Sequence, residues 1–147
     1  MRRLLATICC LFVAASSQAK PELVAKLRDW SVVKVTDSMT DKSTCVAIYR
    51  DTSNIALHAE RLSITMKGRG GVSTYQYRYD KQSATDFAPR MSTDSRDMWW
   101  TGDMDRLLSS ARLQVRIKPL IGNIADFDID LSNAKAVHAV LVGEKCR

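Results

Sequence analysis

The chain has 147 residues and a formal net charge of +6, a length that suits one domain. Its 22 basic and 16 acidic residues are interspersed, with no run of five or six like charges. A nucleic-acid-binding protein gathers its basic residues into a stripe, so this composition argues against a nucleic-acid partner and predicts a solvated surface of mixed charge.

The N-terminal residues 1–19 have the three parts of a secretory signal peptide. Two arginines precede the uncharged apolar segment Leu4–Ala15, and small residues occupy the −3 and −1 positions before Lys20. The apolar segment is shorter than the roughly 20 residues that a membrane-spanning helix needs. We therefore expect cleavage between Ala19 and Lys20, and a single β-rich domain over residues 20–147. This domain should be periplasmic or secreted, without stable membrane insertion.

Removal of the signal would leave two of the four cysteines, Cys45 and Cys146. In an oxidising compartment two remaining cysteines usually pair, so we expect a disulfide bond between them, with two free thiols as the alternative. Cys9 and Cys10 lie inside the apolar segment, with no small-residue pair before either. This position disfavours lipid modification.

Alternation of apolar and polar residues, which is typical of strands, runs through most of the chain after the signal. In chain order the expected strands are Trp30–Val35, Cys45–Tyr49, one long strand over Ile55–Met66, Val72–Tyr79, and shorter segments at Phe87–Met91 and Met98–Thr101. The glycine-rich Lys67–Gly71 predicts a turn. Within Val72–Tyr79 the three tyrosines would share one face, and Arg78 would lie on the other.

Two further strands are expected at Arg112–Lys118 and Ile124–Leu131, separated by a turn at Gly122-Asn123. If they pair antiparallel, basic and amide side chains of the first face acidic side chains of the second, and the apolar residues share the other face. The predicted pairs are Arg116 with Asp126, Gln114 with Asp128, and Arg112 with Asp130.

Two segments are predicted to be helical. Gly102–Ala111 has Asp103 as a candidate N-cap. The stretch after Ser132 places apolar residues at helical spacing, with Ser132 as the candidate cap and Gly143 as the end. Together the elements predict a mainly β fold, an antiparallel β-sandwich or open barrel with one short helix and a C-terminal helix.

Motifs for catalysis or cofactor binding do not have the required spacing. The alternating aspartates from Asp126 to Asp130 suggest calcium, but an EF-hand loop needs glycine and glutamate where Leu131 and Val137 stand. His58 and His138 have no sequence neighbours at metal-ligand spacing. No serine lies in a G-x-S-x-G turn, and the phosphate-loop pattern does not occur. We expect no catalytic residue, metal site or cofactor.

Trp99-Trp100 is the most unusual local feature of the sequence. Adjacent residues of a strand point to opposite faces, so one indole can fill the core while the other meets a partner. Exposed aromatic rings beside arginines are common anchors of binding surfaces. The candidate interaction surface consists of Trp99, Trp100, Arg96 and Arg78. The alternative is that a loop or helix covers both rings.

Several short motifs follow one another in a recognisable order. Trp30 opens the first strand, Cys45 opens the second, Asp105–Leu108 precedes the strand Arg112–Val115, and Phe127–Leu131 leads into a C-terminal helix that ends near Cys146. This order resembles the invasion-associated locus B-like family of exported bacterial proteins. The resemblance implies a periplasmic or secreted β-sandwich of a Gram-negative bacterium, a structural bridge between Cys45 and Cys146, and no catalytic residues. Members often carry further cysteines early in the chain, whereas Val33–Val35 contains none.

These observations favour a non-enzymatic exported binding domain that recognises another protein or a cell-envelope component, for example as an inhibitor or immunity-type protein. One alternative is a hydrolase of envelope polymers whose aspartates or glutamates converge only in the fold. That enzyme would need a deep pocket with two carboxylates. Another is a carrier of a small apolar ligand, which would need an interior cavity.

Overall fold

The fold is taken from a computed structural model that describes residues 21–52, 54–66, 69–89, 97–100 and 103–146, with the side chains of 89 and 97–100 left aside. The predicted signal peptide, its cleavage site between Ala19 and Lys20, and Arg96 lie outside the described residues.

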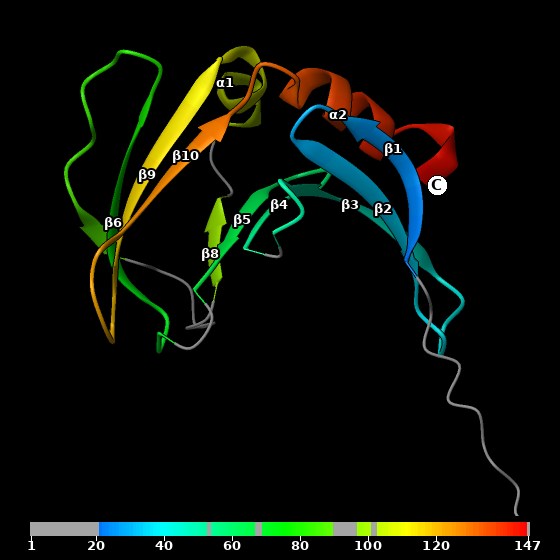
Figure 1. The fold of residues 1–147 in the computed structure, drawn as a ribbon, viewed down its shortest axis with the longest axis horizontal. Helices are drawn as coiled ribbons and strands as arrows, with labels where there is room; N and C mark the ends of the chain where they lie inside the picture. The colour runs from blue at the N-terminus through cyan, green and yellow to red at the C-terminus, as the bar shows by residue number, and fades with distance from the viewer. Residues whose placement is uncertain (1–20, 53, 67–68, 90–96, 101–102, 147) are drawn as a thin grey trace, which may run out of the picture.

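The described strands form two antiparallel sheets that do not close into a barrel, which confirms the predicted fold class (Figure 1). The six-stranded sheet has the order β1 (Glu22–Leu27), β2 (Trp30–Thr36), β3 (Ser43–Tyr49), β4 (Ile55–Leu57), β5 (Leu62–Thr65) and β8 (Asp97–Trp100). The four-stranded sheet has the order β10 (Ala125–Asp130), β9 (Arg112–Pro119), β6 (Val72–Tyr79) and β7 (Ala88–Pro89).

The long strand predicted over Ile55–Met66 is wrong, because the chain turns back between β4 and β5. The backbone N–H of His58 donates to the carbonyl of Arg61 at 2.7 Å and closes the turn between them. The predicted alternation still holds on β5, where Leu62 and Ile64 are fully buried. The polar residues between β4 and β5 are better solvated in a turn than in a strand interior.

The helices α1 (Met104–Ser109) and α2 (Ala134–Leu141) lie at one end of the molecule in Figure 1, and the short 3₁₀ helix η1 (Glu144–Cys146) follows α2. The carboxylate of Asp103 caps α1, as predicted, by accepting a hydrogen bond from the backbone N–H of Arg106 at 3.0 Å. The predicted cap of α2 is wrong: Asn133, not Ser132, is its N-cap. The backbone N–H of Ser132 instead donates to the carboxylate of Asp130 at 2.8 Å.

The core lies between the two sheets and beneath α2, which packs on β1, β2 and β3. At its centre the rings of Trp30 and Tyr49 lie 4.9 Å apart. The predicted disulfide bond is present between Cys45 of β3 and Cys146 of η1, with an Sγ–Sγ distance of 2.02 Å. It fastens the C-terminal segment to the six-stranded sheet. In the part of the chain that is described, no helix has the length and apolar character to cross a membrane.

Candidate functional site

The outer surface of the four-stranded sheet gathers polar side chains from three strands. The predicted register of β9 and β10 is confirmed, with Arg116 opposite Asp126, Gln114 opposite Asp128, and Arg112 opposite Asp130. On the other side of β9, the neighbouring strand β6 places Gln76 opposite Arg116 and Arg78 opposite Gln114. We call this surface the polar face, and it consists of Gln76, Arg78, Arg112, Gln114, Arg116, Asp126 and Asp128. Because strand residues alternate, Leu113, Val115 and Ile117 point the other way and are buried.

Two arginine–aspartate pairs fix the polar face. Arg116 binds Asp126 through two parallel hydrogen bonds, with Nε–Oδ1 at 2.7 Å and Nη2–Oδ2 at 3.0 Å. Arg112 pairs with Asp128, with Nε–Oδ1 at 2.6 Å, and not with Asp130, which lies directly opposite. The long arginine side chain reaches the diagonal neighbour, a contact that cross-strand spacing allows. Asp130 accepts from the backbone of Ser132 instead.

The carboxyl groups of the polar face stay ionised. The hydrogen bonds from Arg116 hold the pKa of Asp126 below its ordinary value, and those from Arg112 do the same to the pKa of Asp128. A general acid needs the opposite, a carboxyl whose pKa is raised toward neutrality. The arrangement therefore suits recognition by fixed charges better than proton donation.

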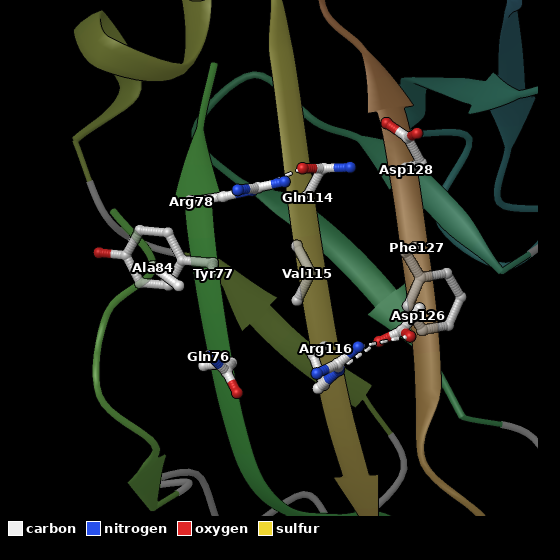
Figure 2. A pocket seen from close by; sticks show the side chains of 10 residues that line it. All are labelled: Gln76, Tyr77, Arg78, Ala84, Gln114, Val115, Arg116, Asp126, Phe127 and Asp128. Carbon is white, nitrogen blue, oxygen red and sulfur yellow. Dashed lines mark hydrogen bonds and ion pairs between the residues drawn. The ribbon is translucent and has the colours of Figure 1, made fainter. Parts of the chain in front are cut away.

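A groove of about 450 Å³ runs over the polar face (Figure 2). Gln114 lies at its centre, where the side-chain oxygen accepts a hydrogen bond from Nε of Arg78 at 2.6 Å. At the β6 side the segment after this strand folds back along it. The N–H of Thr85 donates to the carbonyl of Tyr77 at 2.8 Å, and Ala84 lines the groove there. The floor and walls thus combine backbone, aliphatic and charged groups.

A second groove, of about 530 Å³, lies where the two sheets approach each other; Arg112 lines this groove, and Asp128 lines both. The phenol of Tyr49 spans the two sheets, because its oxygen accepts from the backbone N–H of Asp130 at 3.0 Å. Burial raises the pKa of Tyr49. The guanidinium groups of Arg28 and Arg50 line the rim, from turns where both residues have positive φ, +49° and +48°.

The side chains of both histidines form contacts at the turn between β4 and β5. The ring of His58 lies 3.3 Å from the hydroxyl of the buried Ser63, and burial lowers the pKa of this histidine. The ring of His138 lies 2.8 Å from the carbonyl of Ala59. Among the described residues, no three His, Cys, Asp or Glu side chains gather as a metal site would need.

The predicted interaction surface is only partly placed. Arg78 lies exposed on the polar face. Trp99 and Trp100 belong to β8, an edge strand of the other sheet, and pair there with Ser63 and Leu62. Their side chains and Arg96 lie outside the described residues, so this surface stays a prediction. The groove at Gln114 was not predicted, although the alternation that predicted the register also places Gln114, Arg116 and Asp126 of its lining on one face.

Comparison with known proteins identifies no relative of this chain. No protein-family model matches it, and neither a curated protein nor a solved structure does. The site must therefore be interpreted from its own chemistry.

Proposed function

We propose that the chain is an exported, non-enzymatic binding domain that recognises a protein or a cell-envelope component through the polar face. The observation that carries this proposal is the groove at Gln114, whose charged walls are held in place before any partner arrives. Fixing side chains in advance lowers the entropic cost of binding. The predicted signal peptide, the resemblance to the invasion-associated locus B-like family and an inhibitor or immunity role remain part of the proposal.

The arginines of the polar face are oriented and still accessible. The side chains of Arg112 and Arg116 remain 55% and 52% exposed although each binds a carboxylate. A guanidinium has five N–H donors, so each keeps donors for a partner after forming two hydrogen bonds. Arginine is also enriched among residues that dominate binding energies. A partner with carboxylate or carbonyl oxygens spaced along an extended segment would complement this face.

The ionisation of the groove supports binding over hydrolysis. The aspartates that line it have lowered pKa values and are neutralised by arginines, whereas the rival hydrolase would need one carboxyl that stays protonated near neutral pH. The disulfide bond between Cys45 and Cys146 agrees with a periplasmic or secreted location, because such bonds persist in oxidising compartments.

The test exchanges the two charges of one ion pair. Arg116→Asp combined with Asp126→Arg keeps an ion pair in the polar face but reverses its direction. The wild-type protein and the exchange variant are immobilised at equal density and exposed to envelope extract, and the bound molecules are identified by mass spectrometry. We expect the exchange variant to fold as the wild type does and to lose the partner that the wild type captures.

Lys26→Ala is the matched control, since Lys26 forms an exposed ion pair with Asp51 in the other sheet. It should capture the same partner as the wild type. Equal capture by the exchange variant would reject the polar face as the site. Absence of any specific capture by the wild type would reject the binding function itself. Trp100→Ala in the same assay tests the sequence-predicted surface, where loss of capture would place the contact on β8.

A further inference from the structure

The turn between β9 and β10 presents aliphatic side chains to solvent. Leu120, Ile121 and Ile124 are 62%, 66% and 54% exposed. No other three exposed large apolar residues of the described chain fall within five consecutive residues, and exposed apolar side chains one at a time are ordinary on a protein surface. Three within five consecutive residues form an exposed apolar cluster, which we call the hairpin tip (residues 120–124).

The hairpin tip is held by the neighbouring turn between β5 and β6. The backbone N–H of Leu120 donates to the carbonyl of Gly71, and that of Ile121 donates to the carbonyl of Arg69, both at 3.0 Å. Nη1 of Arg69 donates to the carbonyl of Asn123 at 3.1 Å. Gly70 lets the two turns approach, because a Cβ there would meet Cδ1 of Ile121 at 3.1 Å. Three backbone groups of the tip are therefore hydrogen-bonded to the neighbouring turn, which fixes its position.

Cations flank the hairpin tip. Lys118 and Arg69 are exposed beside it, while the nearest carboxylate along the hairpin, Asp126, is neutralised by Arg116. Figure 1 places this turn at the end of the molecule opposite α1 and α2. An exposed apolar cluster with flanking positive charge is complementary to an anionic bilayer surface. Aliphatic groups enter the boundary between headgroups and acyl chains, and cations bind the phosphates.

We propose that the hairpin tip docks the protein peripherally on an anionic lipid bilayer. The flanking cations Lys118 and Arg69 argue for this occupant, since an anionic bilayer offers phosphates to both cations and an apolar interior to the three aliphatic side chains. The contact is peripheral because three side chains bury far less apolar area than a membrane-spanning helix. This surface is separate from the polar face, so either can function without the other.

The test measures binding to vesicles. Protein is expressed from the full reading frame and purified in the exported form, with mass spectrometry verifying its N-terminus so that no signal segment can anchor it. It is sedimented with vesicles of phosphatidylcholine alone or mixed with phosphatidylglycerol, at low and high salt. We expect binding to the anionic vesicles that weakens with salt.

Variants then locate the contact. Leu120→Ser combined with Ile121→Ser should reduce the partition coefficient about tenfold or more, since both aliphatic groups are lost from the interface. Lys118→Ala should reduce it about fivefold at low salt, as expected for one cation near an anionic surface. Val142→Thr is the control, because Val142 is also exposed but follows α2 at the far end of the molecule.

The outcomes separate the possibilities. Wild-type protein that stays in solution with every vesicle overturns the proposal, as does tip-variant binding equal to that of the wild type. Because the tip is exposed, the variants should keep the wild-type circular dichroism spectrum and disulfide bond. If the double variant misfolds, Lys118→Ala and its salt dependence still decide the question. Failure of the polar-face exchange leaves this result unaffected.

Discussion

The two strands β9 and β10 and the turn that joins them differ in how far their apolar residues are buried. In the strands, polar and apolar residues alternate, and the outer side chains pair while the inner ones fill the core. In the hairpin tip the three apolar side chains are more than half exposed. One hairpin thus contains a stem built for stability and charge display and a tip whose apolar exposure has no role in the fold. An exposed apolar cluster that folding does not require is best explained by contact with something outside the chain.

The largest expected effect comes from removing an isoleucine from the stem. Ile117 is fully buried on β9, so Ile117→Ala should lower the free energy of unfolding by about 2–5 kcal/mol through lost burial and a residual cavity. The same substitution at the tip, Ile121→Ala, should change it by less than about 0.5 kcal/mol. Urea denaturation of both variants measures the difference. Equal destabilisation would show that the tip belongs to the core and would weaken the docking proposal.

A smaller effect is expected within the hairpin tip itself. Gly122 has a φ of +94°, a conformation that residues with a Cβ adopt at a cost of about 1–2 kcal/mol. An added Cβ would meet no atom within 4 Å, so the cost of Gly122→Ala is conformational and not steric. Gly122→Asn should recover part of it, because asparagine tolerates positive φ. Thermal unfolding of the three proteins should therefore rank glycine first, asparagine second and alanine last.

The stem was predictable from sequence because two patterns constrain it at once. A shift of one residue would have placed the acidic side chains of β10 against the core, so charge and hydrophobicity both select the observed register. The diagonal contact of Arg112 with Asp128 was not predictable, because alternation specifies which residues share a face but not which of two neighbours a long side chain reaches. The pairing of Cys45 with Cys146 was predicted because two cysteines remain after the expected removal of the signal peptide, and the observed disulfide bond agrees with it.

Other features depend on tertiary context. β1 was not expected, because it is an edge strand with several exposed residues and shows little alternation. The second groove could not be foreseen either. Arg28 and Arg50 reach this groove from turns in which both have positive φ. Arginine rarely adopts this conformation, and no local sequence pattern predicts it. Ser132 was wrongly predicted as the cap of α2 because the helix begins one residue later, after Asn133, while the backbone N–H of Ser132 donates to Asp130 of β10.

The smallest expected effect is a pH dependence of the free energy of unfolding, to which the charged stem should contribute and the apolar tip should not. Because the folded pKa of Asp126 lies below its unfolded value, its pairing with Arg116 stabilises the protein above that unfolded value, about 3.9. The contribution is lost as pH falls from about 5 through the folded pKa. It is modest because both side chains are more than half exposed, where solvent and salt screen the attraction.

Arg116→Gln should therefore lower the free energy of unfolding at pH 7 and have almost no effect once the pH lies well below the folded pKa of Asp126. Ile121→Ser neither adds nor removes a titratable group, so the difference in the free energy of unfolding between this variant and the wild type should be the same at both pH values. Denaturant titrations across this range measure both differences. A constant deficit for Arg116→Gln at every pH would mean that the arginine acts through packing of its aliphatic stem, and the polar face would then owe its order to contact and not to charge.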